Sequence, residues 1–177
     1  MDFTELSFGK HKGKTLAQVL WVDPDWFFWA HKKKIFQNAN NREAKFLFNR
    51  ATSIKIPKGN PDDWKVEYLA DTNGKYANMS IVDFNKPHHQ GSSKAYYSEV
   101  INISMPTQMA RYDKLGCRLI IKSLKAILFG NSQYRITKQR AEDFFNDDSN
   151  FVLWLKIIFK SYSLYNFFVF IKKGVKA

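Results

Sequence analysis

The chain has 177 residues, of which 45% are hydrophobic and 16% aromatic, and its formal net charge is +12. This hydrophobic content excludes an intrinsically disordered chain and is enough for one core, or for a small module beside a larger domain. The positive charge favours a polyanionic partner, most commonly nucleic acid, with an anionic membrane surface as the competing explanation.

Two glycines bracket a run of cations near the N-terminus, where residues 7–15 read SFGKHKGKT. Because glycine tolerates positive φ, Gly9 and Gly13 predict the two ends of a tight connection. The cations beside them are then left on an exposed loop, whose side chains and free backbone N–H groups are suited to phosphate. The nucleic-acid-binding residues predicted in this loop are Lys10, His11, Lys12 and Lys14.

The loop is one residue too short for the G-x-x-x-x-G-K-[ST] motif of nucleotide hydrolases, because Phe8 stands where that motif needs glycine. The rest of the chain also lacks the repeated strand–helix pattern of such proteins. The sequence therefore does not predict nucleotide hydrolysis.

Residues 6–36 read LSFGKHKGKTLAQVLWVDPDWFFWAHKKKIF, which combines an F-G-K-x-K-G motif, a short helix, an Asp-Pro break and an aromatic-rich helix. The residues that carry this pattern are Phe8-Gly9-Lys10, Lys12-Gly13-Lys14, Asp23-Pro24 and Trp26 to Trp29. On them, the segment resembles the small C-terminal domain of exodeoxyribonuclease X-like proteins and is similar to the related family of quorum-sensing-regulated virulence factors. It covers less than a fifth of the chain.

This resemblance implies an accessory module of nucleic-acid enzymes that associates with DNA or RNA and has no well-defined catalytic residues. No acidic nuclease constellation precedes the motif, so we expect no exonuclease domain beside it. No motif in the remainder of the chain indicates a known family.

Two helix starts follow the loop. Thr15 is a plausible N-cap for a helix over residues 16–22, and Asp23-Pro24 is a cap and first-turn signal for a helix over residues 25–34. The lysines that close the second helix complement its dipole. The aromatic side chains of this region, from Trp21 to Trp29, favour a core over a base-stacking platform.

The polar run at residues 38–41 predicts a boundary between a small hairpin-helix module, residues 1–37, and an α+β domain, residues 42–177. Between residues 44 and 105, β-branched and aromatic residues alternate in part and predict an antiparallel sheet of about four strands. These strands are residues 45–56, 64–69, 76–84 and 96–105. Asn73-Gly74 is a hairpin signal between the second strand and the third.

Residues 107–177 are predicted to be the helical part that packs with the sheet. A helix over residues 107–129 ends at Gly130, and another covers residues 137–145. Asp148-Ser149 can cap a last helix.

The C-terminal residues 151–171 have the length of a membrane span. Lys156 and Lys160 lie inside this stretch, where each charge would be costly. We therefore expect no membrane association, and predict an amphipathic helix over residues 151–162 followed by an aromatic strand over residues 166–172.

The compartment follows from the cysteine usage and the N-terminus. Cys117 is the single cysteine, which excludes an intrachain disulfide and favours a small buried hydrophobe. The N-terminus begins with Asp2 and Glu5 and has no apolar secretory core, so we expect a cytoplasmic protein.

Residues 105–177 contain 13 Lys/Arg against 5 Asp/Glu. Five of these cations recur at helical spacing within an arc of about 80° and predict a second basic surface, separate from the loop. They are Arg111, Lys114, Arg118, Lys122 and Lys125. An opposite apolar arc should pack against the sheet: Tyr112, Leu119, Ile120, Leu124 and Ile127. A solvated helix face is the alternative, but such faces usually interleave Glu with Lys, so the shortage of acids favours a phosphate backbone.

No set of residues predicts catalysis. The acids of the sheet region could in principle gather around magnesium, namely Asp62, Asp63, Glu67, Asp71 and Asp83. The sequence does not show that they converge, and His88-His89 fits a solvated loop better than one metal site. The E-x-K triplet Glu43-Ala44-Lys45 is short enough to arise by chance. We expect no catalytic residue, no metal and no cofactor.

The sequence therefore predicts a non-catalytic nucleic-acid-binding accessory protein of DNA metabolism, which binds DNA in preference to RNA and assists a nuclease or recombination protein. Small basic proteins of this kind are frequent in phages, which is the provenance we expect. The alternative is an adaptor or inhibitor that docks on a nuclease or another nucleic-acid enzyme. A weaker alternative is a metal-dependent nuclease.

Overall fold

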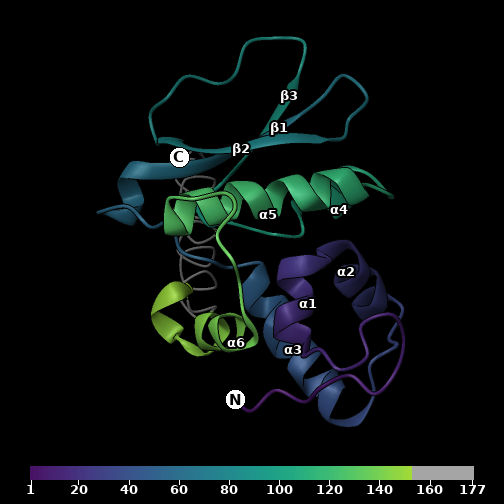
Figure 1. Ribbon diagram of the computed structural model, residues 1–177. Helices are drawn as coiled ribbons and strands as arrows, with labels where there is room; N and C mark the ends of the chain where they lie inside the picture. The colour runs from purple at the N-terminus through teal and green to yellow at the C-terminus, as the bar shows by residue number, and fades with distance from the viewer. Residues whose placement is uncertain (153–177) are drawn as a thin grey trace, which may run out of the picture.

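A three-stranded antiparallel sheet forms one layer of the protein in the computed structural model, which describes residues 1–152 (Figure 1). Its strands are β1 (Trp64–Ala70), β2 (Tyr76–Asp83) and β3 (Lys94–Ser98), in the order β2-β1-β3. The predicted turn joins β1 to β2, where Gly74 has a φ of +75°. The sheet and the helices around it confirm the predicted α+β class.

The central strand β1 presents two different faces. Val66, Tyr68 and Ala70 are buried in the core, whereas Glu67 lies on the opposite face of the pleat. Two predicted strands, over residues 64–69 and 76–84, correspond to β1 and β2. The one predicted over residues 96–105 is shorter in the structure, because β3 ends at Ser98 and a helix begins at Met105.

Three helices precede the sheet: α1 (Leu16–Val22), α2 (Pro24–Lys32) and α3 (Asn38–Ala51). The first two confirm the predicted starts. Thr15 and Gln18 form a capping box at α1, and the Asp23 carboxylate accepts a hydrogen bond from the Trp26 N–H at the start of α2.

The strand predicted over residues 45–56 is wrong, because this stretch begins inside α3. Phe46 and Phe48 alternate with other residues as in a strand, but the buried positions follow the helical period. The buried side chains of α3 are Glu43, Ala44, Leu47 and Ala51. The sheet consequently has three strands where about four were predicted.

The single helix predicted over residues 107–129 is broken in two, α4 (Met105–Met109) and α5 (Lys114–Phe129). The break occurs because Asp113 is an N-cap: one of its carboxylate oxygens accepts a hydrogen bond from the Gly116 N–H at 2.8 Å. A Cβ on Gly116 would clash with that carboxylate. Tyr112, predicted to pack in the apolar arc, therefore lies outside the helix and is exposed.

The α5 helix ends as predicted, at Gly130, whose φ of +69° suits a residue without a side chain. The last helix that the structure describes is α6 (Lys138–Asn146), which Thr137 caps. Short 3₁₀ helices, η1 (Pro61–Asp63) and η2 (Asp148–Asn150), lie before β1 and after α6.

The helix predicted over residues 151–162 lies outside the described residues except for its first two positions, and the strand predicted over residues 166–172 lies wholly outside them. Across residues 1–152, no helix combines the length and the apolar character that crossing a membrane requires.

Figure 1 shows three layers, with α4 and α5 between the sheet and the remaining helices. α5 packs on β2 from one side and on α1 and α2 from the other, while α6 packs on α1. The buried side chains form one hydrophobic cluster that extends from Leu6 to Phe151. The predicted boundary at residues 38–41 falls in the first turn of α3, which packs on α1 and α2.

Candidate nucleic-acid interface

The lysine loop, residues 5–15, closes on itself through its backbone, since its two ends pair in an antiparallel bridge. Gly9 and Gly13 have φ values of +69° and +79°, as their positions in the motif predicted. The backbone N–H groups of Lys12, Gly13 and Lys14 donate to carbonyls within the loop. The expectation of free N–H groups is therefore wrong for these three residues, because closing the loop uses them.

Asp23 binds two of the predicted residues of the loop. The Lys10 Nζ lies 2.6 Å from one Asp23 oxygen, and the His11 Nε2 lies 3.0 Å from the same oxygen. The His11 ring is buried against the edge of Trp26. Burial alone would raise the pKa of Asp23, but the hydrogen bonds from Lys10 and His11 outweigh it and lower that pKa. Both side chains thus serve an internal carboxylate.

The other two lysines of the loop differ in exposure. Lys12 is exposed, Lys14 is half-buried, and neither forms an ion pair with a residue that the structure describes. Lys12 is consequently the member of the loop best placed to meet a phosphate.

The lysine loop and the start of α5 approach each other around Asp25, in the first turn of α2. Burial and the neighbouring Asp23 raise the pKa of Asp25, whereas the charges of Lys10 and Lys114 act to lower it. Both lysines therefore lie near the same carboxyl group. The lysine loop and the start of α5 therefore both lie within electrostatic range of this end of α2.

Three cations follow one another along the exposed face of α5, and we call them the α5 row: Lys114, Arg118 and Lys122. Each lies one helical turn from the next, about 6 Å along the axis. No member forms an ion pair with another described residue. The opposite face of α5, which includes Cys117, Ile120 and Leu124, is buried.

The remaining two members of the predicted stripe are placed differently. Arg111 is exposed but precedes α5, beyond its N-cap. Lys125 is half-buried, and burial lowers its pKa. The structure thus keeps three of the five predicted cations as one exposed row and puts Arg111 beside its beginning.

The acids of the sheet do not come together. Within residues 1–152, no three His, Cys, Asp or Glu side chains are arranged to hold a metal ion. Glu67, only 4% exposed, accepts hydrogen bonds from Lys86 Nζ at 2.9 Å and from the Tyr97 hydroxyl at 3.1 Å. Burial alone would raise the pKa of Glu67, but these two bonds outweigh it and lower the pKa.

The histidine pair binds the β2–β3 loop to the sheet. The backbone N–H of His89 donates to the Tyr97 hydroxyl at 2.9 Å, and its ring nitrogen Nε2 lies 2.7 Å from the Ser93 hydroxyl. The His88 ring meets Tyr97 edge-on. These contacts, together with the Lys86–Glu67 pair, account for both histidines structurally.

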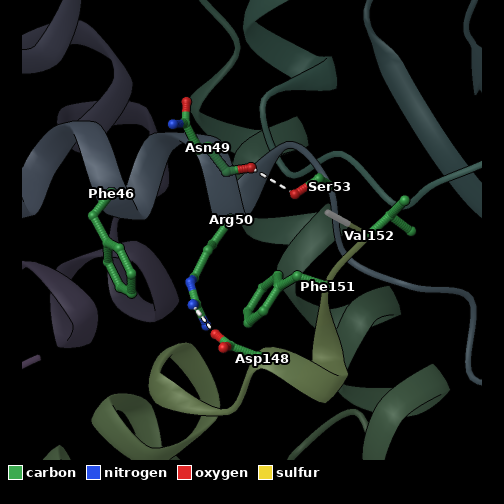
Figure 2. Close-up of a pocket in the computed structure, with 7 residues that line it drawn as sticks. All are labelled: Phe46, Asn49, Arg50, Ser53, Asp148, Phe151 and Val152. Atoms are coloured by element: carbon green, nitrogen blue, oxygen red, sulfur yellow. Dashed lines mark hydrogen bonds and ion pairs between the residues drawn. The ribbon is translucent and has the colours of Figure 1, made fainter. Parts of the chain in front are cut away.

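A cavity of about 180 Å³ lies between α3 and η2, and Figure 2 shows the residues that line it. Arg50 crosses it, stacked over Phe46 and Phe151, and pairs with Asp148. The Arg50 guanidinium also donates to the Phe145 carbonyl at 2.7 Å. Its charge is therefore already used within the fold and does not mark a binding site.

Cys117 is buried on the inner face of α5. Burial raises the pKa of its thiol to about 12, with smaller contributions from the carboxylates of Asp25, Asp113 and Asp23. The thiol is therefore protonated at neutral pH and unreactive, which agrees with the predicted role of a small buried hydrophobe.

The aromatic run is mainly core, as predicted: Trp21, Phe27 and Phe28 are buried, and Trp29 is the exposed member. Sequence reasoning missed Tyr112, which is 75% exposed beside the α5 row. The available signal was Asp113, because an N-cap residue inside the periodic stretch moves the residue before it out of the helix.

Comparisons with protein-family models, with curated proteins and with solved structures found no match to this chain.

Proposed function

We propose that the protein is a non-catalytic nucleic-acid-binding accessory protein of DNA metabolism. The observation that carries the proposal is the α5 row, in which three exposed cations stand on one face without an ion pair to a described acid. Arg111 extends the row at its start. The net charge of +12 also makes the long-range electrostatic potential of the protein positive.

The physical basis of binding is the release of counterions from phosphates. Each cation of the row that neutralises a phosphate adds a favourable term that does not depend on base sequence. The resemblance of residues 6–36 to a module of nucleic-acid enzymes supports the same partner class. Within that class we take DNA in preference to RNA as the partner, and a nuclease or recombination protein as the factor that this protein assists.

The test is charge reversal in the α5 row. Arg118→Glu/Lys122→Glu should bind oligonucleotides more weakly and should lower the slope of log Kobs against log salt by about two, one for each lost contact. Fold is retained because both side chains point away from the buried face of α5. Fluorescence anisotropy over a range of salt gives the affinity and the slope, and circular dichroism checks the fold.

The matched control is Lys45→Glu/Lys55→Glu, which makes the same charge change at exposed positions on and just after α3. It should lower the slope less than the row variant does. Equal effects would mean that only net charge matters, and no binding by the parent protein would remove the proposal. In that last case the α5 row would serve the alternative role, docking on an acidic partner protein.

A further inference from the structure

The packing of the fold does not explain why the Tyr112 side chain is exposed. It stands between Arg111 and the N-cap Asp113, and 75% of it is open to solvent. An apolar residue at this position often packs back on the fourth helical residue, here Cys117, but Cys117 is already buried by other groups. Among residues 1–152, no hydrogen bond or ring contact holds the Tyr112 side chain.

A second apolar side chain lies beside it. Leu115, in the first turn of α5, is 67% exposed and adjoins Lys114 in sequence. Two cations and two apolar side chains therefore lie within five residues: Arg111, Tyr112, Lys114 and Leu115. Proteins that bind single-stranded nucleic acid combine these groups, since cations meet phosphates while aromatic rings stack on bases.

The position of α5 argues against this helix entering the major groove of a duplex. A helix of about 10–12 Å diameter enters the major groove, about 12 Å wide, only when it protrudes from the protein. Here the sheet lies on one side of α5, and α1 and α2 lie on another (Figure 1). A duplex would thus offer α5 its phosphates alone, whereas unpaired bases can reach Tyr112.

We propose that this surface binds single-stranded nucleic acid, with Tyr112 stacked on a base while Arg111 and the α5 row contact the flanking phosphates. The inference rests on the proposed function and deepens it. Stacking does not depend on base identity, because every base has a π-face, so binding is tolerant of sequence. The phenol ring supplies the stacking surface, and its hydroxyl is dispensable.

The experiment compares four labelled probes of one length: single-stranded DNA, the matching RNA, the duplex, and a DNA strand in which all bases are removed. The parent protein should bind the single strands more tightly than the duplex. Tyr112→Ala should weaken single-strand binding by roughly 5- to 100-fold. The duplex and the abasic strand should change by less than about twofold, with the salt slope unaltered, because no phosphate contact is lost.

Two control variants accompany it. Tyr112→Phe keeps the ring and should bind as the parent does. Phe84→Ala removes another exposed aromatic, 46% exposed and directly after β2, and should leave every affinity unchanged. Preferences between the DNA and RNA strands identify the natural sugar.

Unchanged single-strand affinity in Tyr112→Ala overturns the inference, as does equal weakening of the normal and abasic strands. If the parent binds duplex at least as tightly as single strand, the inference fails while the proposed function stands. If the parent binds none of the four probes, the proposed function fails, and the inference with it.

Discussion

At the scale of single residues, two aspartates each join two parts of the chain. Asp23 caps α2 and also binds Lys10 and His11 of the lysine loop. Asp113 caps α5, and its second carboxylate oxygen accepts a hydrogen bond from the Tyr76 N–H at the start of β2, at 3.0 Å. Each carboxylate thus satisfies a helix end and fixes a neighbouring segment with the same charge.

We expect Asp23→Asn to destabilise the protein by about 1 to 3 kcal/mol at neutral pH, because it removes charge-assisted hydrogen bonds from a largely buried site. The native pKa of Asp23 is lowered from its ordinary value of 3.8. Its contribution is therefore fully present above 3.8 and is lost as the pH falls through the native pKa. Urea unfolding of parent and variant, at neutral pH and in acid, measures the difference.

The control for this prediction is Glu5→Gln, which breaks the exposed Lys138–Glu5 pair. Exposed pairs of this kind contribute little, so that variant should unfold as the parent does. A stability difference for Asp23→Asn that is independent of pH would show that the carboxylate charge is not what stabilises the loop.

At the scale of elements, local chemistry decided which helices could be predicted. Thr15 and Asp23-Pro24 predicted the starts of α1 and α2, because helix capping depends on residues that are close in the sequence. α3 carried no such signal: its N-cap, Gln37, makes no side-chain hydrogen bond, and its first turn is a polar run that looks like a loop. Its stability comes instead from packing on α1 and α2, which the local sequence does not display.

Like the helices, the candidate site could be predicted from the sequence only in part. Helical spacing selected Lys114, Arg118 and Lys122, which form an exposed row. The same spacing also selected Arg111, which precedes α5, and Lys125, which is half-buried. The pairing of Lys10 and His11 with Asp23 was not, since it depends on how the lysine loop folds back on α2. Spacing cannot tell a cation that serves an internal acid from one that is free for a ligand.

This distinction predicts different effects for two lysines of one loop. Lys12→Ala should reduce the salt slope of nucleic-acid binding by about one and leave stability unchanged, because Lys12 is exposed and unpaired among the described residues. Lys10→Ala should lower the thermal midpoint, since it leaves Asp23 with only His11 and the Trp26 N–H as partners. Anisotropy and thermal melts of both variants make the comparison, and the opposite assignment would contradict it.

At the scale of the whole molecule, one core joins residues 1–37 to the rest of the chain, although the sequence predicted a boundary between them. Trp21, in α1, contacts the Phe129 ring at the end of α5. It also meets Phe144 and Phe145 of α6, with ring centroids 5.2 and 6.2 Å away. Residues 1–37 therefore bury their aromatic side chains partly against the second half of the chain, in one continuous cluster.

Because a small module gains most of its stability from such burial, we expect the full chain to unfold in a single transition. Far-UV circular dichroism and tryptophan fluorescence should give coincident urea curves. Trp21→Ala should shift both curves together and cost about 3 to 5 kcal/mol, since it removes a large side chain between α1, α5 and α6. If the two probes separate, or if the variant shifts only one of them, residues 1–37 unfold as an independent domain, and the lysine loop and the α5 row would then be joined by an interface that can open.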